Sequence, residues 1–314
     1  MQRETDSRPR LVEPGALARR RDRAMGLGFA GGADFLWRHV AEGLSERIAD
    51  CTRAFPDVAI LGTGAGAVAA ALPEGAGTGR LLQIDPSPRM AGAAARAHPR
   101  AETRADDADT LPLAEEDWDL ALSVLGLHWA DDPVGQLIQM NRALRPDGLM
   151  IAALFGGESL RELRDALTRA ESEVTGGLSP RVAPMGEVRD LGALLQRAGF
   201  AMPVADAERL TVTYESPLAL MRELRAMGET NILDARHRVP LRRGVLLRAA
   251  EIYAAEHALP DGRVPATVEI VILTGWAPAE GQPRPLRPGS ARTRLADALG
   301  SVEIPAGAKA DPGR

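Results

Sequence analysis

Residues 57–85 read DVAILGTGAGAVAAALPEGAGTGRLLQID, and their pattern indicates the fold class. The apolar run 57–61 predicts a buried strand, and 80–85 predict a second strand that ends in Asp85. Between them lies a turn that leads into a helix of small residues, and its glycines are Gly62, Gly64 and Gly66. Such glycines let the backbone approach a ligand closely, while the helix start presents N–H groups. An acid that ends the next strand, about 20 residues on, typically binds the ribose hydroxyls of a nucleoside. The stretch therefore predicts a nucleoside site.

The spacing of the glycines indicates which nucleoside binds. A dinucleotide site uses the longer G-x-G-x-x-G pattern, and a nucleoside triphosphate site adds a lysine. Neither is present, so the turn favours S-adenosylmethionine over NAD or ATP. Asp107 and Ala108 stand where an acid accepts from the adenine amino group and a backbone N–H meets the ring.

The pattern of strands alternating with helices extends in both directions from this stretch. Such alternation predicts a parallel sheet with helices on both faces. We expect an α/β fold with a seven-stranded, mostly parallel sheet, N-terminal helices and a helical insertion before the last strand. The expected strands are 57–61, 80–85, 102–104, 118–123, 149–155, 209–214 and 267–274.

Composition excludes several classes of function. The 314 residues carry a net charge of −5, which argues against a general nucleic-acid binder because phosphate neutralisation needs a basic surface. The single cysteine, Cys51, excludes a disulfide framework or a cysteine-based metal site within the chain. No apolar run is long enough to span a bilayer, and the N-terminus lacks the apolar segment of a signal peptide. An intracellular protein without a transmembrane segment is expected.

Residues 30–200 resemble class I S-adenosylmethionine-dependent methyltransferases, which implies their Rossmann-like fold and cofactor. Further blocks are similar to one subfamily, the methyltransferase-fold assembly factors of respiratory complex I in mitochondria and α-proteobacteria. These blocks cover nearly the whole chain except the tail: residues 19–24 (RRRDRA), 127–132 (LHWADD), 144–148 (LRPDG), 156–164 (GGESLRELR), 176–184 (GGLSPRVAP), 227–231 (MGETN) and 274–276 (TGW).

The resemblance implies a protein substrate, possibly a complex I subunit, and a cytoplasmic protein that is peripheral at the inner membrane through its partner. The mitochondrial member is held to hydroxylate an arginine, whereas a more distant relative methylates malonyl-acyl carrier protein in biotin synthesis. The family carries an acid two residues before its first glycine, where it helps hold the methionyl end of the cofactor. Ile60 stands there. One alternative is a small-molecule or acyl-carrier methyltransferase. The replacement of the acid by Ile60 favours a second alternative, a non-catalytic assembly chaperone.

Composition and periodicity, together with the resemblance, predict the organisation of the chain, since residues 1–12 are polar and the chain from Pro278 on is rich in Pro, Gly and Arg without apolar periodicity. We expect a flexible N-terminus, a methyltransferase-like domain and a disordered tail, at 1–12, 13–277 and 278–314. Within the domain, N-terminal helices, a cofactor-binding core and a helical lid are expected at 13–52, 55–156 and about 215–260.

Catalytic candidates are few, which suits methyl transfer because the sulfonium carries the reactive group and the protein supplies alignment. His128, just past the fourth strand, is the best-placed base and Trp129 is a candidate substrate residue, although both could equally pack the pocket. The five histidines include no H-x-D/E pair, so no metal site is expected. The arginine-rich run 19–23 reads as a solvated helix face that could meet an acidic partner.

Substrate candidates lie after the fifth strand. Glu158 and Glu162 open a helix at the rim of the pocket, where they either favour the helix dipole or pair with a cationic substrate such as an arginine. Arg181, between two prolines, either binds substrate backbone or holds a structural carboxylate. Tyr214, where the late strand meets the insertion, is a candidate for lining the substrate cleft.

Overall fold

The computed structural model describes residues 10–106, 109–283 and 293–302. It divides into a main unit that ends at Glu280 and a C-terminal unit that begins at Gly281. The described part of the C-terminal unit includes one short helix, α10 (Leu295–Leu299). Disorder of the tail stays a prediction.

A seven-stranded sheet forms the centre of the main unit, as the alternating pattern predicted. The strands follow the order β3-β2-β1-β4-β5-β7-β6. Neighbours from β3 to β5 pair in parallel, whereas β7 pairs antiparallel with both β5 and β6. The strands are β1 (Asp57–Leu61), β2 (Arg80–Asp85), β3 (Glu102–Ala105), β4 (Trp118–Val124), β5 (Leu144–Phe155), β6 (Ala201–Tyr214) and β7 (Val264–Trp276).

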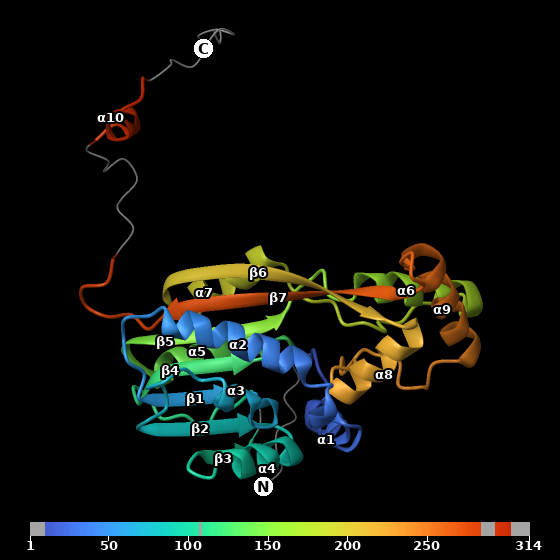
Figure 1. Ribbon diagram of the computed structural model, residues 1–314, viewed down its shortest axis with the longest axis horizontal. Helices are drawn as coiled ribbons and strands as arrows, with labels where there is room; N and C mark the ends of the chain where they lie inside the picture. Colours follow the sequence, from blue (N-terminus) through green and yellow to red (C-terminus); the bar gives the residue numbers. More distant parts are fainter. Residues whose placement is uncertain (1–9, 107–108, 284–292, 303–314) are drawn as a thin grey trace. The chain divides into compact units, whose positions relative to one another are not determined.

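Helices cover both faces of the sheet (Figure 1). One apolar layer packs β1, β4 and β5 against α2 and α3 and includes a methionine of α4, whereas the other packs the sheet against α5 and α7. The strands β1, β4 and β5 are buried on both faces, which explains their continuous apolar runs. These helices are α2 (Phe35–Ala49), α3 (Ala67–Ala70), α4 (Pro88–Ala97), α5 (Pro133–Ala143) and α7 (Val188–Arg197).

The edge strand β6 is longer than its sequence suggested. We predicted a strand over 209–214, but β6 begins at Ala201. The early part carries Pro203, a register shift between Ala201 and Val204, and a positive φ of 47° at Met202. An edge strand tolerates proline and a bulge because one of its sides has no neighbouring strand. These features removed the simple alternation on which the prediction depended.

The remaining helices gather beyond the carboxyl ends of the parallel strands (Figure 1). They are α1 (Ala16–Gly26), α6 (Arg161–Thr175), α8 (Pro217–Met227) and α9 (Arg243–His257). Helices α6 and α9 pack on each other, and α8 packs against both α9 and α1. The two helices of the predicted lid at about 215–260 therefore contact each other, and the lid itself stays a prediction. Among the described residues, no helix has the length and apolar character needed to cross a membrane.

Candidate active site

The glycine turn closes tightly against the end of β4. Gly62, Gly64 and Gly66 have φ values of 86°, 52° and 105°, a region that L side chains rarely adopt. A Cβ on Gly62 would lie 2.2 Å from the carbonyl oxygen of Val124. The turn therefore needs glycine at position 62 both for its conformation and for its contact with β4.

Asp85 lies at the carboxyl end of β2 and is fully buried. Its Oδ2 accepts hydrogen bonds from the backbone N of Thr63 at 3.1 Å and from Arg21 Nη1 at 3.4 Å. Its Oδ1 accepts from the backbone N of Ser87 at 3.0 Å. Backbone donors from both flanking turns thus hold the carboxylate at the place where the nucleoside pattern predicted it.

Arg21 is a functional candidate that the sequence interpretation missed. We predicted that residues 19–23 form a solvated face, but Arg21 is 1% exposed. Its Nη2 donates to the carbonyl oxygen of Leu125 at 2.6 Å, and its guanidinium carbon lies 4.9 Å from the ring centroid of Trp37. Helical spacing contained a signal, because Leu17, Arg21 and Ala24 recur on one face and all three are buried. The expectation of a solvated run is therefore wrong for this residue.

A second buried group forms where β4 ends. His128 and Trp129 lie in the short helix η3 (Leu127–Trp129), and both side chains meet Glu229 from the loop after α8. Trp129 Nε1 donates to Glu229 Oε2 at 2.7 Å, and His128 Nε2 lies 3.4 Å from the same oxygen. Burial raises the pKa of Glu229, but His128, the charge of Arg21 and Trp129 outweigh it, so its pKa lies below the ordinary value. Glu229 is therefore a buried, ionised carboxylate.

Three known proteins resemble the chain over most of its length. The arginine-hydroxylase NDUFAF5, mitochondrial, of Danio rerio is 38% identical over 84% of this chain and 82% of the relative. The human protein of the same name is 37% identical over 88% and 80%. The malonyl-[acyl-carrier protein] O-methyltransferase of Halorhodospira halophila is 34% identical over 77% and 81%. In addition, the family model described as a methyltransferase domain matches residues 60–152.

The chain therefore belongs to the methyltransferase-fold family that includes the NDUFAF5 relatives. Solved structures support the fold. The YcgJ protein of Bacillus subtilis superposes with a TM-score of 0.54 at 14% identity, over 77% of this chain and 99% of that chain. The [4+2]-cyclase SpnF also gives 0.54, at 17% identity, over 87% and 100%. A cyclase among the neighbours illustrates that this fold does not determine the reaction.

The cofactor of this methyltransferase-like protein is S-adenosylmethionine, and the side chains of the cleft fit it. Asp85 suits the ribose hydroxyls, and a cavity of about 310 Å³ beyond it, lined by Pro86, Asp106 and Trp129 among others, is large enough for a nucleobase. Beside Gly62, in contrast, the cavity measures about 20 Å³, room for about one water and far too little for the rest of the cofactor. Leu17 and Arg21 of α1 line it, so these side chains must shift when the cofactor binds.

The adenine candidates Asp107 and Ala108 lie outside the described residues. Their neighbour Asp106 lines the 310 Å³ cavity, and its backbone N donates to the carbonyl oxygen of Asp85 at 3.3 Å. Asp109 Oδ1 accepts from the backbone N of Asp131 at 2.9 Å. The described neighbours on either side, Asp106 and Asp109, are therefore both held by hydrogen bonds.

The substrate candidates of the methyltransferase-like chain have partners of their own. Arg161 pairs with Glu158 at 2.8 Å, and Glu162 accepts from both the backbone N and the hydroxyl of Thr267. Arg181 pairs with the buried Glu171. Tyr214 packs with α6 and α9, and burial together with Glu223 raises its pKa above the ordinary value. The structure joins His128 and Trp129 through Glu229. The other substrate candidates have different partners, and their substrate roles stay predictions: Glu158, Glu162, Arg181 and Tyr214.

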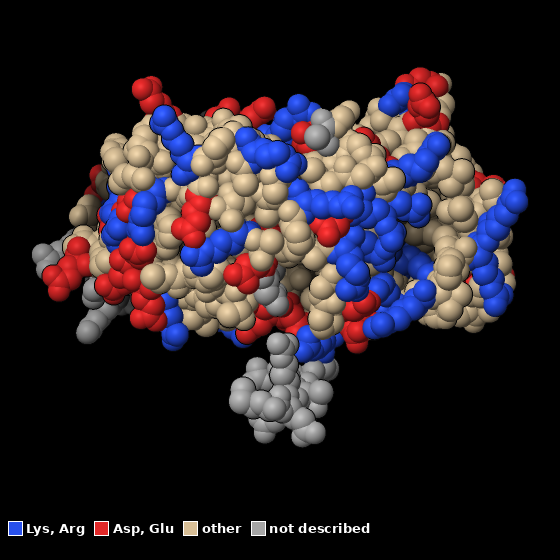
Figure 2. All heavy atoms as spheres, turned by 90° about the horizontal axis from the view of Figure 1, so that it is seen from below, with Lys and Arg blue, Asp and Glu red and all other residues tan. Residues whose placement is uncertain are grey.

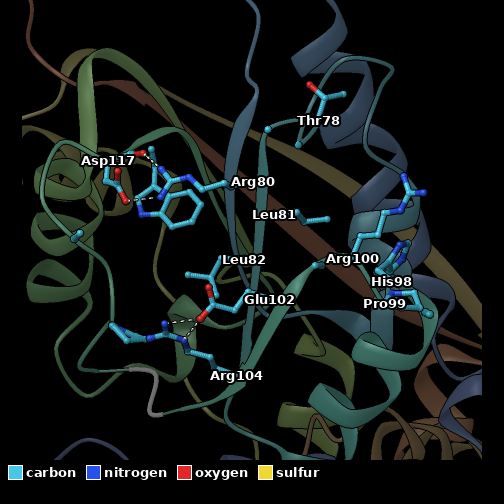
Figure 3. Close-up of a pocket in the computed structure, with 17 residues that line it drawn as sticks. Thr78, Arg80, Leu81, Leu82, His98, Pro99, Arg100, Glu102, Arg104 and Asp117 are labelled. Atoms are coloured by element: carbon cyan, nitrogen blue, oxygen red, sulfur yellow. Dashed lines mark hydrogen bonds and ion pairs between the residues drawn. The ribbon is translucent and has the colours of Figure 1, made fainter.

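A hollow of about 900 Å³ lies at the opposite ends of β2 and β3 and is a poor candidate for the site. Figure 3 shows that Arg80 pairs with Asp117, and Arg104 with Glu102, inside the hollow. Arg80 Nη1 donates to Asp117 Oδ2 at 2.8 Å, and Arg104 Nε donates to Glu102 Oε1 at 2.7 Å. In the part of the chain that the structure describes, no group of three or more His, Cys, Asp or Glu residues could hold a metal ion.

Arginines gather on the surface beside α1 (Figure 2). Burial and the positive charges of Arg23, Arg236 and Arg19 lower the pKa of Arg20, which shows that these side chains lie close together. Glu13 pairs with both Arg19 and Arg236. One carboxylate thus serves three guanidinium groups, because Arg238 also lies within 3.9 Å of Glu13, and the surface beside α1 is rich in arginine although the whole chain carries a net charge of −5.

Proposed function

We propose that this protein is an S-adenosylmethionine-dependent enzyme that modifies a protein substrate during assembly of respiratory complex I. The observation that carries the proposal is the similarity to the arginine-hydroxylase NDUFAF5 relatives over 84% of this chain. The sequence blocks that resemble the complex I assembly factors support the same process. The enzyme would act in the bacterial cytoplasm and reach the inner membrane through its partner.

The chain's own residues suit transfer of a methyl group. S-Adenosylmethionine supplies the activated methyl group when it is bound. Asp85 would hold the ribose, and α1 with the loop after α8 would exclude water from the cleft. His128 lies at the end of β4, and its Nδ1 has no hydrogen-bond partner among the described residues. That nitrogen would take the proton that the substrate nucleophile loses.

The surface around the cleft suits a polypeptide with charges of both signs. Glu158, whose side chain is 35% exposed, would exchange Arg161 for a cationic side chain of the substrate. The basic surface beside α1 would attract acidic residues that flank it. A protein segment can offer both, which favours a protein over a small molecule.

Two other products have specific support. Hydroxylation is the activity for which the NDUFAF5 relatives are named, and it would require dioxygen and a two-electron reductant, with the second oxygen atom leaving as water. Methylation of malonyl-acyl carrier protein is named for a relative of 34% identity. A non-catalytic assembly chaperone remains the alternative without a product.

Mass spectrometry of the substrate tests the proposal. Purified protein and S-adenosylmethionine are incubated with complex I isolated from cells that lack the gene, and malonyl-acyl carrier protein serves as a second substrate. Gain of a methyl group on a complex I subunit is the expected result, and Asp85→Ala should abolish it. Gain of an oxygen atom in an aerobic assay with a reductant would establish hydroxylation. Methylation of the carrier protein alone would overturn the protein-substrate assignment.

A further inference from the structure

The amino-acid end of S-adenosylmethionine presents a specific electrostatic problem to this chain. That end carries an ammonium and a carboxylate, and charged groups taken out of water need charged or hydrogen-bonding partners. The strand that leads into the glycine turn offers no charge near its end, because Ile60 is fully buried among apolar side chains. The partners must therefore come from elements outside the strand–turn–helix unit.

Two charged residues from distant parts of the sequence converge near the end of β4, next to the turn on the Arg21 side. Arg21 lines the small cavity together with Gly62, Ser123 and Gly126. Gly228 packs on it, since a Cβ at position 228 would lie 3.3 Å from the Cα of Arg21. The next residue is Glu229, whose side chain is 5% exposed. A guanidinium and a carboxylate are thus brought to the end of β4 by α1 and by the loop after α8.

Both residues keep a buried polar atom unused. Among the described residues, Arg21 Nε and Glu229 Oε1 have no hydrogen-bond partner, and neither does the neighbouring His128 Nδ1. Buried polar atoms are nearly always paired in native proteins, so a cluster of unpaired ones points to a ligand. The free atoms comprise a donor on a cation and an acceptor on an anion, which is the complement of an amino-acid zwitterion.

We infer that Arg21 and Glu229 bind the amino-acid end of the cofactor, Arg21 through its carboxylate and Glu229 through its ammonium. The guanidinium fork matches a carboxylate geometrically, and the free carboxylate oxygen accepts from an ammonium. If Arg21 turns from Asp85 to the ligand, the Asp85 carboxylate stays hydrogen-bonded, because the backbone N–H groups of Thr63 and Ser87 still donate to it. The residues then supply the charge that position 60 lacks. This inference rests on the cofactor in the proposed function.

Two ligands that differ only at the amino-acid end test the assignment. S-Adenosylhomocysteine carries the zwitterion, whereas 5′-methylthioadenosine has the same nucleoside and thioether without it. Calorimetric titration of both into the wild type and into Glu229→Gln separates the contributions. The variant should bind S-adenosylhomocysteine roughly tenfold more weakly or worse, because a charge-assisted hydrogen bond is lost. Its affinity for 5′-methylthioadenosine should stay within about twofold.

Arg21→Met provides an independent arm of the experiment. The variant should bind S-adenosylhomocysteine roughly tenfold more weakly, because the charged partner of the ligand carboxylate is lost. Its affinity for 5′-methylthioadenosine should stay unchanged or rise, because the side chain at position 21 is then apolar and no longer held by charge in the cleft. Glu171→Gln is the matched control, because Glu171 is a buried, ion-paired carboxylate of α6. It should change neither affinity. Thermal unfolding of each variant establishes that it is folded.

The outcomes separate this inference from the function on which it rests. If the wild type binds neither ligand, the cofactor assignment fails, and the inference fails with it. If the wild type binds S-adenosylhomocysteine but Glu229→Gln loses both ligands equally, Glu229 is structural and the inference alone is overturned. Unchanged S-adenosylhomocysteine affinity in a folded Glu229→Gln protein would overturn it as well, even if Arg21→Met did not fold.

Discussion

The cofactor cleft and the junction of α6 with β7 each bury a glutamate, and they satisfy it to different degrees. Glu162 of α6 accepts from the backbone N and the hydroxyl of Thr267 and pairs with Arg161. Glu229 in the cleft receives Trp129 and His128 on one oxygen, and its other oxygen has no partner among the described residues. A satisfied buried charge holds elements together, whereas a partly satisfied one marks a place for a ligand. The difference supports a scaffold role for Glu162 and the binding role proposed for Glu229, two residues of the same chemistry.

The strongest test of the cleft removes the carboxylate of Asp85. Asp85→Ala should lower the free energy of unfolding by about 3–5 kcal/mol, because it leaves the buried guanidinium of Arg21 without its charge partner. Urea unfolding at neutral pH measures the loss. Asp206→Ala is the control, since Asp206 forms an ion pair with Arg47 in which both side chains are about 40% exposed, and should cost roughly 0–1 kcal/mol. Equal losses would show that burial of the cleft charges has no energetic consequence.

The next largest effect concerns the glycine turn. Gly62→Ala should cost roughly 2–5 kcal/mol, because a strained φ and a clash with the Val124 carbonyl add together. Gly75→Ala isolates the first contribution, since Gly75 has a φ of 90° but a Cβ added there would meet no atom within 4 Å. It should cost roughly 1–2 kcal/mol. If the two variants unfold at the same urea concentration, the tight contact between the turn and β4 is not real.

On the scaffold side, Glu162→Gln should separate stability from binding. The amide oxygen can still accept from the Thr267 N–H, but the hydroxyl must turn to accept from the amide and the charge that pairs with Arg161 is lost, so the free energy of unfolding should fall by about 1–3 kcal/mol. The affinity for S-adenosylhomocysteine should stay unchanged, in contrast to Glu229→Gln. Calorimetric titration at a temperature where both variants are folded makes the comparison. A parallel loss of cofactor affinity would contradict the scaffold role of Glu162.

The smallest expected effect is a pH dependence of the scaffold. The hydrogen bond from Arg181 lowers the pKa of Glu171 below its ordinary value. A lowered folded-state pKa contributes stability above the unfolded-state pKa, and this contribution is lost as the pH falls through the folded-state pKa. Glu171→Gln should therefore be less stable than the wild type by about 1 kcal/mol at neutral pH. The gap should narrow in acid, and a constant gap in unfolding measurements from neutral to acidic pH would refute the coupling.

Several features of the site could be predicted from the sequence, for identifiable reasons. The strands and helices around 57–85 follow from local periodicity, and the place of Asp85 follows because parallel strands end at one edge of the sheet. The alternation of elements likewise predicted the seven strands. The edge strand β6 was predicted too short because its bulge and proline break the periodicity.

By itself, the sequence determined the order of the elements, the glycine turn and the acid at its far side, since these depend on neighbouring residues. Tertiary structure alone decided that Arg21 meets Asp85, 64 residues away, and that Glu229 meets His128, 101 residues away. Local patterns carry no information about such pairs, because the packing of α1 on α4 and of α8 on α1 decides which residues meet. The arginine run also looked solvated in sequence, since a single buried cation becomes favourable only when a distant carboxylate arrives to pair with it.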